Sequence, residues 1–247
     1  AEKKGEKLRY APPEELRAEA REEAPTVIAT VRDADGNVVR RLEGPVKAGF
    51  HRVAWDLRLP APQPVSLEEQ EPDQFSLPPM GPLALPGRYT VSLEKRVDGK
   101  LTELAAPQPF EAVAVGTATL PARDKAELQG FQKQVARLQR AVLGAVEAAK
   151  ETQARLDHVK KALVETPGAE ARWGDEARAL EARLKDLRQE LEGDRALARR
   201  NEPVPPSIAE RVGGIVDSQW LSTSAPTTTN REQLELAELS DRADEPL

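Results

Sequence analysis

The first half of the chain alternates apolar and polar positions with a period of two, which is typical of half-buried β-strands. TVIATVRD and VVRRLEG flank the turn residues Asp35 and Gly36, and RYTVSLEKR and KLTEL flank Asp98 and Gly99. Glycine tolerates the positive φ of a tight turn, so each pair of runs predicts a β-hairpin. Two more runs, FHRVAWDLR at 50–58 and PFEAVAV, also predict strands.

Six predicted strands with proline and glycine connections indicate an α+β fold that begins with a small antiparallel β-sandwich at 25–116. Its 60–86 loop carries eight prolines, which cannot donate to an interior ladder. In FHRVAWDLR, alternate side chains share a face, so the run predicts that His51 packs beside Trp55 at the edge of the core. The predicted core and turn residues are Asp35, Gly36, Gly49, His51, Val53, Trp55, Pro86, Gly87 and Tyr89.

The second half has a helical period instead. Apolar residues recur in steps of three and four from Leu128 to Leu163, and again from Trp173 to Leu191, on either side of a Pro-Gly pair. This pattern predicts a long antiparallel helical hairpin at 122–200. Short helices that pack on the hairpin are expected at 201–247, the first of them capped by Ser207. Residues 1–24 form a lead-in segment with a possible short helix.

A stripe as long as 128–163 needs more cover than one neighbouring helix supplies. One interpretation is that the remaining helices of the bundle cover the stripe. The other is that part of the stripe, including Leu138, Val142 and Leu156, forms a surface for a protein partner. Bundle cores usually explain heptad stripes, which favours the first interpretation.

Charge and composition exclude several classes of function. Charged residues make up 32% of the chain and the net charge is −6, so no general attraction to nucleic acid is expected. No apolar run approaches the roughly 18 residues that span a bilayer. The chain has no cysteine, which rules out disulfides, thiolate metal sites and a cysteine nucleophile. Its first residues do not form a signal peptide, although a signal could have been removed or the chain could be an internal fragment.

No pattern of residues predicts catalysis. The two histidines, His51 and His158, are about a hundred residues apart, and Asp56 lies on the opposite strand face from His51. DADGN resembles the start of a calcium loop, but its glycine comes early and position twelve from Asp33 is Gly44, not glutamate. We therefore predict no catalytic residue, no cofactor and no metal site.

The motifs resemble a known family. VRDADGNVVRRLEGPVKAGFHRVAWDLR, followed by PGRYTVSLE, resembles the Ig-like module of the flagellar hook-capping type, although Leu57 stands where that module often has glycine. Together with RNEPVPPSIAERVGGIV and PTTTNREQLELA, the chain from about Leu8 to Ala243 is similar to the C-terminal region of bacterial sortilin-like, BNR-repeat "glycosyl hydrolase" proteins. The resemblance implies one or two preceding β-propellers that would hold any activity. It also leads us to expect export to the periplasm, cell surface or medium of a bacterium.

Three functional hypotheses follow. The first is a non-catalytic accessory region that binds a protein partner, either a propeller or a second copy through its helices. The second is a carbohydrate-binding or carbohydrate-active unit, with Phe75 or Trp220 stacking on sugars. The third is a subunit of an extracellular or cell-surface assembly.

Overall fold

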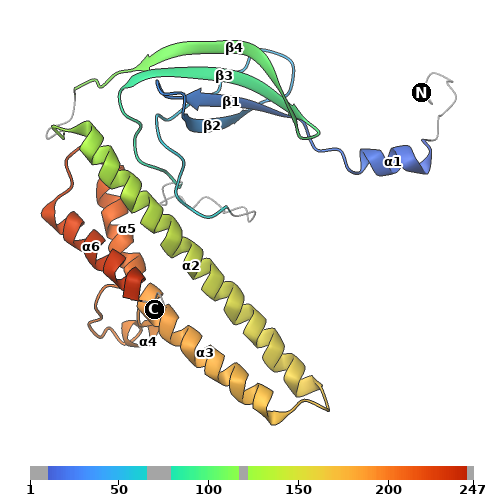
Figure 1. Cartoon of the computed structure of the whole chain (residues 1–247), viewed down its shortest axis with the longest axis vertical. Coiled ribbons are helices and arrows are strands. Elements are labelled where there is room, and N and C mark those ends of the chain that lie inside the picture. Colours follow the sequence, from blue (N-terminus) through green and yellow to red (C-terminus); the bar gives the residue numbers. More distant parts are fainter. Residues whose placement is uncertain (1–10, 66–78, 117–121, 244–247) are drawn as a thin grey trace. The chain divides into compact units, whose positions relative to one another are not determined.

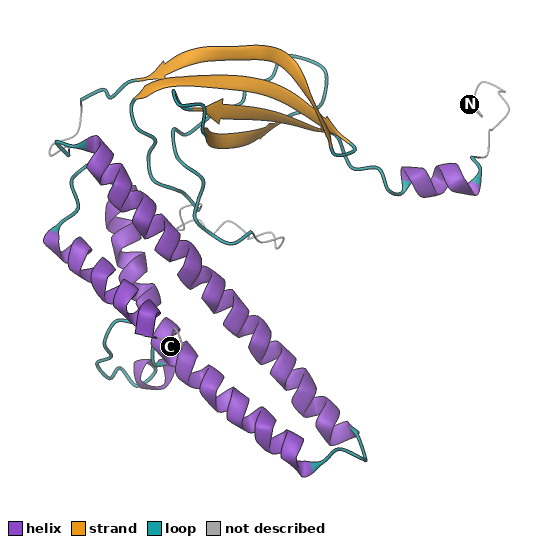
Figure 2. Ribbon diagram, in the orientation of Figure 1, coloured by secondary structure: helices purple, strands orange, loops and turns teal. Residues whose placement is uncertain are grey.

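The computed structural model describes residues 11–65, 79–116 and 122–243. The chain divides into a sheet unit, Ala1–Leu57 with Pro86–Ala114, and a helical unit, Arg58–Leu85 with Val115–Leu247 (Figure 1). Figure 2 shows the strands gathered in the first unit and the long helices in the second. The sheet is antiparallel and the helical region follows it, which confirms the predicted α+β class.

The sheet has four strands in the order β2-β1-β3-β4, and each neighbouring pair is antiparallel. The strands are β1 (Thr26–Arg32), β2 (Val38–Gly44), β3 (Gly87–Val97) and β4 (Lys100–Ala112). Two runs that were predicted as separate strands, KLTEL and PFEAVAV, contribute to the single strand β4. Pro107, in the break between them, and Pro109, at the start of the second run, are tolerated because β4 is an edge strand.

Both predicted hairpin turns are confirmed. The β1–β2 turn is held by the Asp33 carboxylate, whose Oδ1 accepts from the backbone N–H groups of Asp35 (3.1 Å) and Asn37 (2.8 Å). Gly36 has φ 83°, which a side chain would disfavour. In the β3–β4 turn both Asp98 and Gly99 have positive φ, as a two-residue type I′ turn requires.

The predicted strand at 50–58 is wrong. Residues 50–56 have no strand hydrogen bonding, yet their side chains still cover the sheet. The Trp55 ring meets Tyr89 edge-on at 5.4 Å and Phe110 at 6.0 Å, and Val53 lies against Gly44. The alternation in FHRVAWDLR therefore reports side-chain burial rather than a hydrogen-bonded ladder. This segment anchors on one face of the sheet through its aromatic ring.

The helical unit is dominated by one element. Helix α2 (Lys125–Glu165) has 41 residues and pairs with α3 (Ala171–Glu192). The other helices of this unit are α4 (Arg195–Ala198), α5 (Ile208–Trp220) and α6 (Thr228–Ala243), whereas the short α1 (Pro13–Glu19) belongs to the sheet unit. Asp124 caps α2 by accepting from the N–H groups of Ala126 and Glu127. The predicted Ser207 cap of α5 is confirmed and forms a full capping box with Glu210.

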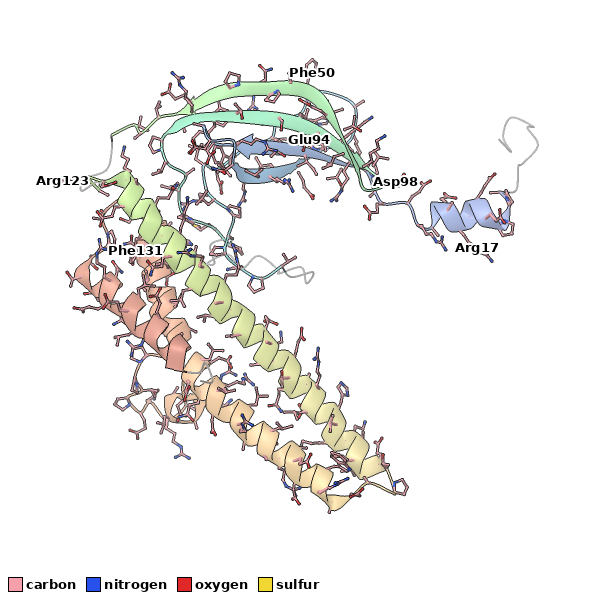
Figure 3. All side chains as sticks on the ribbon, viewed as in Figure 1. Arg17, Phe50, Glu94, Asp98, Arg123 and Phe131 are labelled. Atoms are coloured by element: carbon pink, nitrogen blue, oxygen red, sulfur yellow. The ribbon has the colours of Figure 1, made fainter. Side chains whose placement is uncertain are left out.

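The core of this unit lies around the first half of α2, where α5 and α6 pack beside it (Figure 1). Its buried residues are Phe131, Val135, Leu138, Val142, Val212, Ile215, Trp220, Leu234 and Ala237. Val135 and Ala237 have no exposed surface. Figure 3 shows Phe131 on the α2 ribbon beside these helices. Beyond Val142, no residue of α2 belongs to this core, and Figure 1 shows α3 beside this half of the helix.

The proline-rich segment was predicted as a loop of the sheet unit, but its described residues belong to the helical unit. The Arg58 guanidinium donates from Nη1 to the carbonyl oxygens of Trp220 (2.8 Å) and Gly81 (3.0 Å). Trp220 is the last residue of α5, whose terminal carbonyls attract a cation. Met80 packs against the helical core, so the segment contributes to the packing of that core.

We predict that Gly81→Ala destabilises the helical unit by about 1–3 kcal/mol, the usual cost of overpacking. A Cβ there would lie 2.5 Å from the Pro60 carbonyl oxygen and closer still to that of Leu59, both of them rigid backbone atoms. The matched control is Gly130→Ala in α2, where a Cβ meets nothing within 4 Å. There the higher helix propensity of alanine should raise the free energy of unfolding by about 1 kcal/mol. Urea unfolding measures both, and equal effects would contradict the assigned packing of Gly81.

Candidate functional site

The second half of the α2–α3 hairpin is only two helices thick. Its seam buries Leu156 of α2 and Ala177 and Leu184 of α3, each 8% exposed or less. Lys160 Nζ donates across the seam to Glu181 Oε2 at 2.8 Å. This hydrogen bond raises the pKa of Lys160 and lowers that of Glu181, so both groups stay charged near neutral pH. The ion pair places neighbouring residues Val159 and Leu180 at the same level of the hairpin.

One side of this seam is apolar and open to solvent. Val159 on α2 is 48% exposed, and Trp173, Leu180 and Leu187 on α3 are 45%, 52% and 51% exposed. The three α3 residues are seven positions apart, nearly two helical turns, so they line up along one side. Val159 and Leu180 each follow a seam residue by three positions, a step that turns to the same side of both helices in an antiparallel pair. We call these four residues the open face.

The predicted stripe is therefore only half buried along the hairpin. Ala145, Thr152 and Val159 were expected inside but are exposed, whereas Val146 and Gln153 are half-buried in their place. A helix with one packed neighbour buries a single narrow strip, and the other half of its heptad stripe turns away from that strip. The sequence could not separate the two halves, because both carry apolar residues.

The residues predicted as a partner surface lie elsewhere. Leu138 and Val142 are buried in the core with α5 and α6, and Leu156 is buried in the α2–α3 seam. These three side chains are thus packed inside the chain and are not available to a partner. The interpretation in which other helices cover the stripe holds for the first half of α2. Along the second half of α2, the open face is the candidate partner surface instead.

The sheet unit places the predicted turn and core residues without building a reaction site. Asp35 and Gly36 form the β1–β2 turn, and Pro86 and Gly87 lead into β3. Gly49 and His51 lie in the loop, where His51 Nε2 is 2.5 Å from the Lys47 carbonyl oxygen and the ring is exposed rather than packed beside Trp55. Val53 and Trp55 cover the sheet, and Tyr89 is buried, with its pKa raised by burial and by the nearby Asp33 charge.

The aromatic residues proposed for sugar stacking offer little support for that role. Trp220 is only 2% exposed and belongs to the helical core, so it presents no ring face to a ligand. Phe75 lies outside the described residues. Phe50 is fully exposed on the sheet unit (Figure 3), and it follows the positive-φ Gly49 in an irregular loop. Stacking on a sugar normally uses an aromatic ring fixed beside polar groups, and within the described part of the chain no other aromatic ring packs against Phe50 to fix it.

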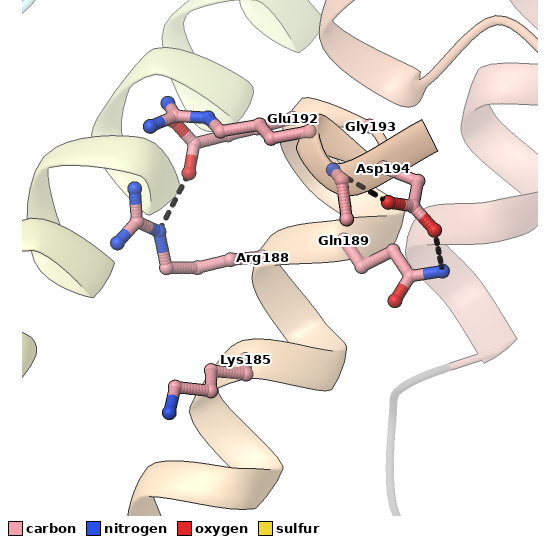
Figure 4. Close-up of a pocket in the computed structure, with 8 residues that line it drawn as sticks. Lys185, Arg188, Gln189, Glu192, Gly193 and Asp194 are labelled. Atoms are coloured by element: carbon pink, nitrogen blue, oxygen red, sulfur yellow. Dashed lines mark hydrogen bonds and ion pairs between the residues drawn. The ribbon is translucent and has the colours of Figure 1, made fainter. Parts of the chain in front are cut away.

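A shallow hollow of 290 Å³ lies where α3 ends (Figure 4). Its charged groups are paired with one another: Arg188 Nε donates to Glu192 at 2.6 Å, Arg195 donates to the same carboxylate at 2.7 Å, and Gln189 donates to Asp194 at 3.2 Å. The two arginine hydrogen bonds lower the pKa of Glu192. The Asp194 carboxylate also caps the short helix α4. These groups join α3 to α4, and each charged group of the hollow is paired within the chain.

The described residues hold no cluster of three or more histidine, cysteine, aspartate or glutamate side chains that could bind a metal ion. Among the same residues, no helix is both long enough and apolar enough to cross a membrane. Comparison with known proteins gave no matching family model, no similar curated protein and no similar solved structure. The open face is therefore the candidate site that the geometry itself supplies.

We predict that Glu192→Gln destabilises the chain at neutral pH and that its deficit relative to wild type closes in acid. The pKa of Glu192 lies below its ordinary value of 4.5 in the folded chain, so its ionised form stabilises the fold above that value. This stabilisation is lost as the pH falls through the lowered pKa. Urea unfolding from pH 7 to pH 3 measures the deficit, with Glu190→Gln as the exposed control. A deficit that grows toward low pH would contradict the assignment.

Proposed function

We propose that this chain is a non-catalytic accessory and interaction region that holds a protein partner on the open face of its helical hairpin. The exposure of Val159, Trp173, Leu180 and Leu187 is the observation that carries the proposal. A lone exposed leucine needs no explanation, but four large apolar side chains on one side of two paired helices form a patch. Patches of this kind are typical of protein–protein contacts.

The physics of the hairpin supports this role. Fully burying a leucine or valine side chain contributes about 1.5–3 kcal/mol. Leu180 and Leu187 therefore leave a part of that free energy unused in the single chain. Trp173 adds an amphipathic ring, one face of which carries the Arg172 guanidinium at 4.6 Å. Tryptophan with arginine is enriched at the centres of protein interfaces.

The family setting is part of the same proposal. We infer that the chain corresponds to the region that follows the propellers in bacterial sortilin-like, BNR-repeat proteins, and that it is exported. What supports this inference is the set of motifs around Asp35–Gly36, Trp55 and Pro86–Gly87, which form a hairpin turn, an aromatic anchor and the start of β3. An Ig-like sandwich would need a second layer over the sheet. The segment at 50–56, packed through Trp55, is the described part that covers one face.

We predict that the chain isolated from its natural source has a mass well above 27.1 kDa, because propeller domains would precede this region. Intact-mass spectrometry of the purified natural protein measures this directly. Limited proteolysis of the same sample should release a fragment of about the present size. A natural chain of 27.1 kDa would contradict the placement behind propellers, while leaving the role of the open face intact.

We also predict that the open face is needed for complex formation in the cells that produce the protein. Leu180→Glu places a charge at the centre of the face, so chemically cross-linked complexes that contain the chain should decrease severalfold. Ala182→Glu is the matched control, because Ala182 is exposed two positions away on the opposite side of α3. Cross-linking with amine-reactive reagents followed by mass analysis gives the readout. If both variants form complexes like wild type, the proposed interaction role is wrong.

A further inference from the structure

We propose that the open face binds a second copy of this chain, with the two α3 helices antiparallel and crossing at Leu180. The inference deepens the proposed function, because it names the partner of the same face. It rests on the order of apolar and charged residues along α3. That order becomes complementary to itself when the helix direction is reversed.

The apolar residues are symmetric about Leu180. Trp173 lies seven positions before it and Leu187 seven positions after it. In an antiparallel pair centred on Leu180, each Leu180 therefore meets its copy, and each Trp173 meets the partner's Leu187. Such a contact is isologous: the same patch serves both chains, as in most homodimers. At each end of the contact, the large Trp173 ring of one copy packs against the smaller Leu187 side chain of the other.

Two charges beside this stripe follow the same symmetry to within one residue. Glu176 and Arg183 lie on the open side of α3, one position before the seam residues Ala177 and Leu184. Both are exposed, and neither makes an ion pair within the described residues. Glu176 lies four positions before Leu180 and Arg183 three positions after it, so reversal about Leu180 brings Glu176 of each chain within one residue, about 1.5 Å along the axis, of the partner's Arg183. Two ion pairs form, one on each side of the two-fold axis, and this is the side-chain position that sets partner choice in coiled coils.

The charged residues on the other side of α3, next to α2, are arranged differently, as this dimer requires. Glu181 is paired with Lys160 of α2 and with Lys185, and Arg188 is paired with Glu192. The charges on the α2 side of α3 are therefore satisfied inside the chain. The unpaired charges Glu176 and Arg183 lie on the side that also carries Leu180 and Leu187. A parallel second copy would instead set like charges opposite one another.

Helix α2 fits the same axis. The Lys160–Glu181 ion pair places Val159 beside Leu180 along the hairpin. A two-fold axis through Leu180 therefore brings Val159 near its own copy as well. Three of the α2 residues around it on this side, Ala148, Thr152 and Ala162, are small and exposed, and Arg155, which also lies on this side, is paired with Glu151 of its own helix. Small side chains let two helices approach closely, so the two hairpins can form a four-helix bundle over this stretch.

Disulfide trapping tests the register directly, because the chain has no cysteine of its own. Leu180→Cys should form covalent dimers on mild oxidation of the full chain. Trp173→Cys alone should not, because its two copies would be 14 residues or about 21 Å apart along the axis, beyond the roughly 7 Å Cα separation that a disulfide spans. A mixture of Trp173→Cys with Leu187→Cys should cross-link between the two variants. Ala182→Cys, on the opposite side of α3, is the negative control.

Charge exchange tests the ion pairs without touching the apolar stripe. Glu176→Arg alone and Arg183→Glu alone each set like charges opposite one another, so each should weaken the dimer about tenfold in sedimentation equilibrium. The double variant Glu176→Arg with Arg183→Glu should dimerise like wild type. The two single variants mixed together should pair with each other in preference to themselves. Circular dichroism controls for folding, since all these side chains are exposed.

The outcomes separate this inference from the proposed function. Cross-linking of Trp173→Cys to itself would mean a parallel pair, and equal cross-linking of all variants would mean non-specific collision; either overturns the inference. A chain that stays monomeric at 100 μM while its cellular complexes still depend on Leu180 overturns the second copy as partner and leaves the proposed function standing. If the chain stays monomeric and its cellular complexes do not depend on Leu180, both the inference and the proposed function are overturned. Selective cross-linking through Leu180 with rescue by the double charge exchange supports both.

Discussion

A helix with a single packed neighbour can bury only one narrow strip of its surface, and this constraint shapes the helical unit. The first half of α2 is not limited in this way, because α5 and α6 also pack against it and bury its apolar side chains from Phe131 to Val142. The second half has α3 alone. There the seam takes Leu156, Ala177 and Leu184, and the rest of the apolar stripe remains in water. Stability is thus concentrated at one end of α2 and exposed apolar surface at the other.

The sheet unit also has limited cover for its surface, and a loop segment rather than a helix supplies it. A four-stranded sheet has two faces and two edges, and a single chain segment at 50–56 covers part of one face. The unit relies on the cluster of Trp55, Tyr89 and Phe110, whose rings meet at centroid distances of 5.4 to 6.0 Å. At the β4 edge, Pro107 and Pro109 remove two backbone donors, which discourages pairing with the edge of another sheet. The structure therefore disfavours association through this edge, unlike the open face of the hairpin.

The sequence predicts the parts of this structure that local chemistry determines. The turns at Asp35–Gly36 and Asp98–Gly99, the Ser207 cap and the helical stripes each depend on residues close together in the chain. Prediction fails where a pattern has two structural causes. Alternation at 50–58 arises from side chains that touch a sheet, which the sequence cannot distinguish from a strand within it. Similarly, the a and d residues of a stripe look alike until the number of neighbouring helices is known, so Leu138 and Leu180 could not be told apart.

The contact between Arg58 and the end of α5 joins residues 162 positions apart. It draws a segment from the middle of the sheet sequence into the helical core, together with Met80. As a result, no single cut of the chain separates the two units without removing part of one of them. Contacts of such long sequence separation also form late, because a large loop must close before they contribute. On a ribosome the helical unit would complete its core only after α5 and α6 had emerged, so the segment at 58–85 must wait for the end of the chain.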